Sequence, residues 1–298
     1  MAQQEPLRSP AVISHRIGRT GRFSLNNISG DIRVRGVDGD EARVVARWDG
    51  HSDDPVPLAI NRGDGYLDIE TDQKLGLFSF RRGSIEFQLD LPFNTRVDIT
   101  AVSADIEAHG LTGEQSYRTV SGDLVIDGGG GRISAVSVSG DISLTAVRPA
   151  EVNLTTTSGD VEAFAETFQP VRLKTVSGDM TLRGKFLAGP QHTVESVSGD
   201  LEIEAFNGLT VDTKRGLDLS KKEKRPMVAG DGTASLRFRS LSGDVRLSGV
   251  SPAQSAPVAP EPEPMDEEDS LEVLRALERG EISVDEASRR LEGAGNRG

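Results

Sequence analysis

Residues 119–126 read Thr-Val-Ser-Gly-Asp-Leu-Val-Ile, a turn-forming tripeptide followed by a short apolar run. Ser-Gly-Asp occurs seven times in the chain, and a Ser-Ala-Asp variant ends at Asp105. From Asp105 onward, successive copies lie 18, 18, 19, 19, 21 and 44 residues apart. A fixed period of this size is typical of a repeat array. The glycines and aspartates that we expect to form structural turns are Gly30, Asp31, Gly122, Asp123, Gly140, Asp141, Gly159, Asp160, Gly178, Asp179, Gly199, Asp200, Gly243 and Asp244.

Short alternating runs follow most copies, such as Leu124-Val125-Ile126 and Leu201-Glu202-Ile203. Alternation with period two predicts half-buried strands, and residues 12–250 carry no helix signal. One rung cannot bury its apolar face, whereas stacked rungs share a continuous core. We therefore predict an all-β fold, a β-solenoid with rungs of 18–22 residues and two or three short strands per rung. A β-sandwich would not explain so constant an interval.

Two gaps between copies are longer than one rung. The 44-residue gap before Asp244 is twice 22, and residues 213–218 resemble a degraded copy near the missing position. The 74 residues between Asp31 and Asp105 match four intervals. Both gaps predict rungs that lack the tripeptide.

The residue types of the corner tripeptide suit a tight turn. Glycine adopts the positive φ of a tight turn without steric cost, and Ser and Asp side chains can bond the backbone N–H groups of their own turn. Rungs stacked ~4.8 Å apart would align their carboxylates, which repel by roughly 1 kcal/mol per neighbouring pair in water. Hydrogen bonds or bound cations could offset this repulsion. The candidate calcium ladder is Asp123, Asp141, Asp160, Asp179 and Asp200.

We favour hydrogen bonds, and not bound cations, as the interaction that offsets the repulsion between the aligned carboxylates. Calcium-binding β-rolls carry aspartate on both turns of every coil, whereas the opposite turns here, such as residues 128–131 and 147–150, contain no repeated acid. We therefore expect no metal site.

The chain divides by composition into several parts. We expect a flexible tail at 1–11 and a solenoid at 12–250, in which 12–101 is a less regular capping part and 102–250 the regular stack. The basic stretch at 214–225 reads as a protruding loop. Residues 251–269, SPAQSAPVAPEPEPMDEED, hold five prolines and six acids and predict a disordered linker.

Residues 270–293 predict a helical hairpin. Gly280 is placed to stop the first helix, and residues 283–286 form a capping box for the second. So small a unit cannot be stable alone, so we expect it to dock on the solenoid, form a homo-oligomer or bind another protein. The apolar residues available for this are Leu271, Leu274, Leu277, Ile282 and Leu291.

Charge and hydropathy exclude several functions. Lys and Arg total 34 against 47 Asp and Glu, and the net charge of −13 argues against nucleic-acid binding. No apolar run reaches the ~18–20 residues of a membrane-spanning helix, so we expect no direct membrane insertion. The first 21 residues lack the apolar stretch of a secretory signal, so we expect a cytoplasmic protein, with peripheral envelope association only through a partner.

The sequence shows no recognisable catalytic motif. Its four histidines are scattered, and neither a G-x-S-x-G elbow nor an H-E-x-x-H helix occurs. The chain also has no cysteine, which rules out thiol chemistry. We therefore predict no enzyme and no cofactor. Sugar-processing β-helix enzymes remain an alternative, although Trp48, Tyr66 and Tyr117 are few for a sugar groove.

The recurrent T-V-S-G-D step, as at Thr119–Leu124 and Thr175–Met180, resembles the bacterial "putative adhesin" family DUF4097 over about residues 15–250. The stretch Leu91–Asn94 resembles the entry into the repeats of that family. The last 28 residues, through Leu274–Ser283, resemble a SHOCT-like helical hairpin, which accompanies this domain in some envelope-stress proteins. The resemblance implies a β-solenoid without known catalytic residues.

We therefore predict a non-catalytic β-solenoid scaffold or interaction protein. It would be adhesin-like and linked to envelope stress, and its C-terminal hairpin would mediate oligomerisation or partner binding. One alternative is a structural protein that polymerises end to end, as bactofilins do. The other is a carbohydrate-binding or carbohydrate-cleaving β-helix protein.

Overall fold

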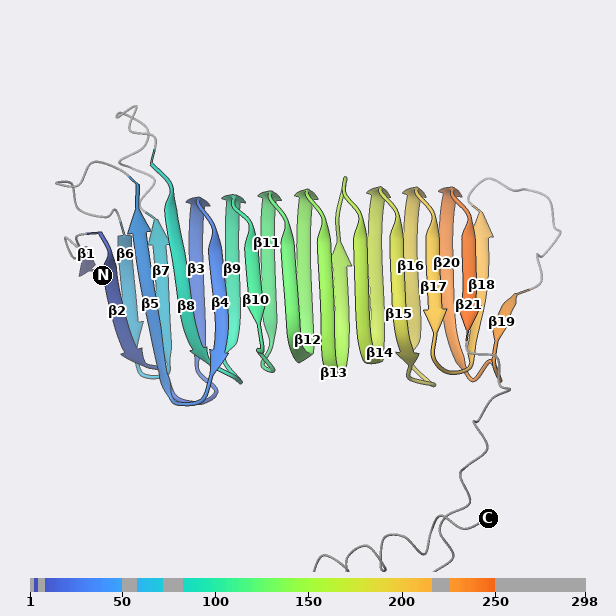
Figure 1. Ribbon diagram of the computed structural model, residues 1–298, viewed down its shortest axis with the longest axis horizontal. Helices are drawn as coiled ribbons and strands as arrows, with labels where there is room; N and C mark the ends of the chain where they lie inside the picture. The colour runs from blue at the N-terminus through green and yellow to red at the C-terminus, as the bar shows by residue number, and fades with distance from the viewer. Residues whose placement is uncertain (1–2, 5–8, 50–57, 72–82, 216–225, 250–298) are drawn as a thin grey trace, which may run out of the picture. The chain divides into compact units, whose positions relative to one another are not determined.

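The computed structural model describes residues 3–4, 9–49, 58–71, 83–215 and 226–249. These residues form strands and the turns between them, and the predicted all-β solenoid is confirmed (Figure 1). No helix in this part of the chain is long and apolar enough to cross a membrane. The predicted linker, the hairpin with its five apolar residues, and residues 216–225 of the basic loop lie outside the described residues.

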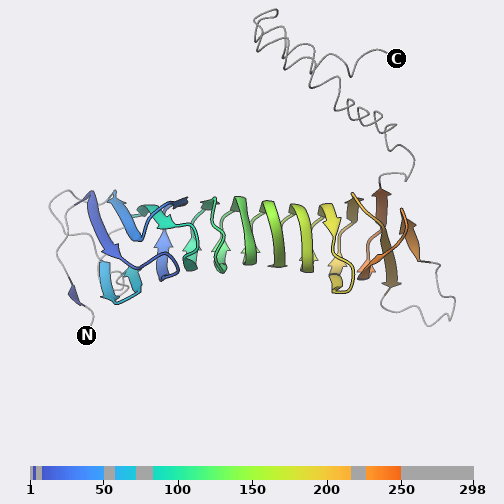
Figure 2. The same cartoon turned by 90° about the horizontal axis from the view of Figure 1, so that it is seen from below.

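Each regular rung has two strands, one before the Ser-Gly-Asp corner and one after it. The strands before the corner stack in parallel into a pre-corner sheet, and those after it into a post-corner sheet (Figure 2). The pre-corner strands include β3 (Arg22–Ser29), β9 (Arg96–Ser103), β11 (Gln115–Ser121), β16 (Gln191–Ser198) and β20 (Ala234–Ser242). The post-corner strands include β4 (Ile32–Val37), β10 (Ile106–His109), β15 (Met180–Phe186), β17 (Leu201–Ala205) and β21 (Val245–Gly249).

Three long strands pass through both sheets: β12 (Leu124–Ser139), β13 (Ile142–Thr155) and β14 (Val161–Ser177). Their pairing shifts register between Asp127 and Gly131, and again between Ala146 and Ala150. The turns that we expected opposite the Ser-Gly-Asp corners are therefore bends within continuous strands, because a register shift lets a strand fold over without leaving the ladder.

The first corner is out of sequence order. β3 pairs with both β7 (Tyr66–Thr71) and β9, while β4 pairs with β8 (Ile85–Pro92) and β10. The Ile32 N–H donates to the carbonyl of Asp105 at 2.9 Å. The prediction of four intervals between Asp31 and Asp105 is therefore wrong, since the intervening strands pack on the outer side of β3 and β4.

The C-terminal end repeats this arrangement. β20 lies between β16 and β18 (Leu209–Arg215), and β21 pairs with β17. The Asp244 N–H donates to Oδ1 of Asp200 at 2.9 Å, so no rung is missing between these corners. Of the degraded copy that we expected at 213–218, Thr213–Arg215 belong to β18, which pairs with β20 on the side away from β16, and residues 216–218 lie outside the described residues.

Antiparallel strands close the N-terminal end. β5 (Glu41–Trp48) pairs antiparallel with β8, and β2 (Ala11–Arg16) with β5. In the other sheet, β6 (Leu58–Gly63) pairs antiparallel with β7, and the two-residue β1 (Gln3–Gln4) with β6. Residues 1–11 are thus not a loose tail throughout.

The core lies between the two sheets and is built from columns of stacked side chains. One column contains Leu124, Ile142, Val161, Met180 and Leu201, each at most 1% exposed. Burying such a side chain stabilises the fold by about 1.5–3 kcal/mol. The stacked rungs therefore hold one another together through the core.

Two polar side chains in the core are fully buried and hydrogen-bonded. The Tyr117 hydroxyl donates to Oε1 of Gln115 at 3.0 Å, and burial raises the pKa of this tyrosine. Nδ1 of His192 accepts the Val171 N–H at 3.2 Å, so Nε2 carries the proton and donates to the Leu187 carbonyl at 3.0 Å. Burial lowers the pKa of His192 and keeps it neutral, so neither group is placed for exchange with solvent.

We predict that Gly140→Ala destabilises the protein more than Gly39→Ala. Both glycines have similar positive φ values, 141° and 138°, but a Cβ at position 140 would lie 2.2 Å from the Gly122 carbonyl, whereas position 39 is open. Backbone strain alone costs about 1–3 kcal/mol, and the clash adds to it at position 140. Urea unfolding of both variants measures the difference. Equal losses would show that close packing of corners is unimportant.

Candidate functional site: the Ser-Gly-Asp corner

The corner motif gives neighbouring side chains different surroundings. In the rung at 119–123, Thr119 points inward and is 3% exposed, while Val120 points outward and is 49% exposed. Gly122 makes the turn at φ 133°. Asp123 directly precedes the post-corner strand, which begins at Leu124. The same turn recurs at Gly140, Gly159, Gly178 and Gly199, with φ between 136° and 141°, so the corner presents columns of equivalent residues.

The aspartates form a ladder that links the rungs. The Asp141 N–H donates to Oδ1 of Asp123 at 2.9 Å, while the Asp141 carbonyl accepts the Leu124 N–H at 2.9 Å. We expected the carboxylate to bond the N–H of its own turn, but it reaches the N–H of the next rung instead. The same side-chain bond, at 2.8–2.9 Å, joins the pairs Asp105–Asp123, Asp141–Asp160, Asp160–Asp179, Asp179–Asp200 and Asp200–Asp244.

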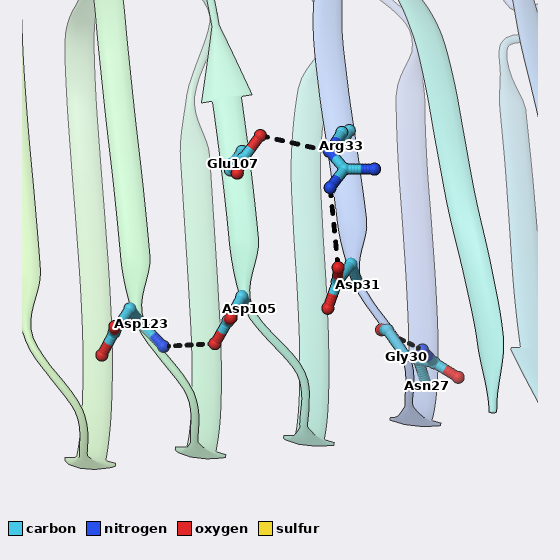
Figure 3. Close-up of polar contacts among 7 residues, drawn as sticks. All are labelled: Asn27, Gly30, Asp31, Arg33, Asp105, Glu107 and Asp123. Atoms are coloured by element: carbon cyan, nitrogen blue, oxygen red, sulfur yellow. Dashed lines mark hydrogen bonds and ion pairs between the residues drawn. The ribbon is translucent and has the colours of Figure 1, made fainter.

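The ladder begins at Asp105, and the first corner is built differently (Figure 3). The Asp31 carboxylate faces Arg33 at 3.6 Å, and Arg33 also pairs with Glu107 at 3.3 Å. Here Nδ2 of Asn27 donates to the carbonyl of Gly30 at 3.1 Å and so holds the turn from inside.

A column of small polar residues lies behind the corner. The hydroxyl groups of Thr119 and Thr156 donate to the carbonyl of the serine two residues later, at 3.2 and 3.3 Å. This bond holds the chain as it enters the turn. Ser137, Thr175, Ser196 and Ser240 occupy the same column and are buried. Thr119 and Thr156 are therefore turn residues, a role not predicted from the sequence, whereas the hydroxyl groups of the other four members have no hydrogen-bond partner within the described residues.

An aliphatic column lies on the outside of the corner, at the position before each serine. We call it the corner ridge. Its seven aliphatic members are 41–55% exposed, and Thr157 is an exposed eighth member. Exposed apolar patches on this scale mark interaction sites. The members are Ile28, Val102, Val120, Val138, Thr157, Val176, Val197 and Leu241.

The sequence analysis missed this ridge. Its signal was the repeated aliphatic residue that precedes the tripeptide in almost every copy. Since Thr119 points inward, alternation requires the next residue, Val120, to point outward.

Several charges on the flat faces are paired between rungs, but those of the ladder carboxylates from Asp105 to Asp200 are not. Arg118 meets Asp98 at 3.0 Å, and Lys174 meets Glu195 at 3.1 Å. Within the described residues, no basic side chain pairs with the ladder carboxylates from Asp105 to Asp200. The corner therefore carries an apolar column beside a column of uncompensated negative charge.

A polar groove of about 380 Å³ is the second candidate site, and it is formed by residues of β3, β6, β7 and β9. Its polar lining is Arg22, Ser24, Asn26, Asn61, Asp68, Glu70 and Asp98. Two of its three carboxylates are already in ion pairs, Asp68 with Arg22 at 3.0 Å and Asp98 with Arg118. The corner is therefore the stronger candidate.

The described residues contain no group of three or more His, Asp or Glu that could hold a metal ion. The five aspartates of the candidate calcium ladder lie in one column, and each directs Oδ1 to the amide of the next rung. The expectation that this column holds no metal stays a prediction.

The repeated Ser-Gly-Asp corners lie largely within a segment that matches a known protein family. The family model described as Toastrack DUF4097 matches residues 18–187, more than half of the 298 residues. The chain belongs to the Toastrack family. The predicted membership is confirmed, whereas the SHOCT-like resemblance concerns residues outside the described part.

Solved structures similar to this Toastrack protein include two from Bacteroides fragilis and Parabacteroides distasonis. The first, described as a "putative adhesin", is 10% identical with a TM-score of 0.48, and the match covers 82% of this chain and 99% of that one. The second, described as a "putative lipid binding protein", is 11% identical with a TM-score of 0.42, covering 80% and 97%. No curated protein matches the chain.

We predict opposite effects from two substitutions in the ladder. Asp141→Ala removes the acceptor of the Asp160 N–H and should lower the free energy of unfolding by about 1–2 kcal/mol. Asp141→Asn keeps an oxygen acceptor and removes a charge, so it should be neutral, or stabilising at low salt. Urea unfolding at low and high salt measures both. Equal destabilisation by the two variants would contradict the hydrogen-bond role.

Proposed function

We propose that this Toastrack protein is a non-catalytic binding scaffold of the adhesin type, which holds a partner along the corner ridge. The observation that carries the proposal is the ridge itself, whose aliphatic side chains are 41–55% exposed although every rung has a well-buried core. An isolated exposed valine needs no explanation, but a column that recurs at the same position in eight rungs does.

The ladder supports this role because it fixes the ridge. Each ladder aspartate is bonded to both neighbouring rungs, so the ridge side chains repeat at the rung spacing of ~4.8 Å. A surface held in this way loses little conformational entropy when a partner binds. A rigid, regular ridge is what a binding scaffold needs.

Cross-linking from the ridge tests the proposal. The chain has no cysteine, so Val138→Cys or Val176→Cys can carry a single maleimide photo-cross-linker in the full-length protein. We expect discrete cross-linked products from both positions when the purified, labelled protein is added to an extract of its source cells. Val147→Cys is the matched control, because Val147 is 52% exposed but lies outside the ridge. Equal products from all three positions, or none from the ridge, would refute the proposal.

The second part of the proposed function concerns the C-terminal hairpin. We propose that it oligomerises the protein or recruits a partner linked to envelope stress. The support is its sequence, with Leu271, Leu274 and Leu277 on one helical face and too few residues for an independent core.

We expect the full-length protein to be oligomeric and a version that ends at Val250 to be monomeric. Light scattering on a sizing column measures both masses. The core of the described residues lies entirely before Val250, so the shorter chain keeps it. Two monomers would restrict the hairpin to binding another protein, and two oligomers of equal size would assign self-association to the solenoid.

A further inference from the structure

We propose that the corner ridge binds a basic amphipathic α-helix of a partner protein, which lies along the solenoid axis with its lysines and arginines over the aspartate ladder. The inference rests on the proposed function and names the class of partner.

The repeat distance of the ridge favours a helix. Eight ridge positions at ~4.8 Å cover about 34 Å, which is the length of a helix of about 22 residues. The apolar stripe of a helix recurs about every 5.4 Å, close to the rung spacing. One face of an extended strand recurs about every 6.7 Å, so its side chains would leave register after two rungs. A helix can therefore keep contact over more rungs.

The charge beside the ridge favours a basic partner. One column of exposed serines separates the ridge from the ladder, as Ser121 separates Val120 from the corner that leads to Asp123. Each ladder carboxylate from Asp105 to Asp200 uses Oδ1 for the next amide and has no basic partner among the described residues. Lysines or arginines on one flank of a helix would supply the missing charge.

A second copy of the chain fits the ridge less well. Two ridges face to face would bring two negative columns together, and the net charge of the chain is −13. A strip about 34 Å long and about 10 Å wide also offers well under the ~800 Å² per partner of a stable interface. The strip suits a weak contact that electrostatic attraction assists, so we expect strong salt dependence.

The test uses a synthetic peptide and the full-length protein. The probe is a fluorescent 22-residue peptide with leucines at helical i, i+3, i+4 and i+7 positions and lysines elsewhere. One control peptide has the same composition without the stripe, and another has the stripe with glutamates in place of lysines. We expect fluorescence anisotropy to show saturable binding of the first peptide only, weakened at least fivefold at high salt.

Two sets of variants separate the apolar and the charged contributions. V120T/V138T/V176T copies the threonine that the ridge already has at Thr157, and should weaken binding at least fivefold. D123N/D141N/D160N/D179N keeps the oxygen acceptors of the ladder, and should weaken binding at least tenfold. The matched controls Val147→Thr and Asp127→Asn change exposed residues outside the ridge and the ladder and should leave binding unchanged. Thermal melting checks that each variant is folded.

Equal binding of the striped and scrambled peptides, or unchanged binding by both multiple variants, would overturn the proposal. A wild-type dimer that V120T/V138T/V176T dissociates would also overturn it and assign the ridge to a second copy. Cross-linking from Val138→Cys distinguishes this failure from that of the proposed function. Ridge cross-links without peptide binding would refute only the helical partner, whereas the absence of both would refute the scaffold as well.

Discussion

The bond from each corner carboxylate to the backbone N–H of the next aspartate is the interaction on which the rest of the solenoid depends. It places a side-chain acceptor where the chain turns and the regular ladder of the sheets is interrupted. Glycine is needed beside it within the regular stack, since a Cβ at Gly140 would lie 2.2 Å from the Gly122 carbonyl, whereas Ala104 takes this place at the first corner of the ladder. Close corners, aligned carboxylates and an outward aliphatic column therefore come from one local arrangement, repeated in each rung.

This arrangement also explains why the corner has an unusual surface. Each aspartate from Asp105 to Asp200 provides its hydrogen bond at the cost of a charge that no basic residue of the described chain offsets, whereas Arg118 and Lys174 on the flat faces are paired. Val120 is exposed because Thr119 before it points inward, where its hydroxyl donates to the Ser121 carbonyl. Structure at the corner thus produces a surface whose chemistry suits binding, and no separate functional insertion is needed.

The regular rungs were predictable from the sequence because their signals are local. Alternation at Leu124–Ile126 and the period of the tripeptide were enough for the fold class and the parallel stack. The order of the end rungs was not predictable, since the contact of Asp31 with Asp105 depends on where β5–β8 pack, and no local signal encodes it. The ridge was not predicted for another reason. From the sequence alone, Val120 is the apolar residue that would be expected to point into the core, and only the buried Thr119 before it shows that Val120 points outward.

The placement of β3–β4 between β7–β8 and β9–β10, and of β20 between β16 and β18, has a consequence for how the repeat array can change in evolution. β3 and β20 are each flanked by strands that do not follow the order of the chain, so neither terminal rung can be removed or duplicated as a unit without separating its neighbours. Gain or loss of whole rungs is compatible with the fold only between β9 and β16, where neighbours in space are neighbours in sequence. The two ends therefore set a fixed frame, and the length of the ridge is the part of this architecture that is free to vary among relatives.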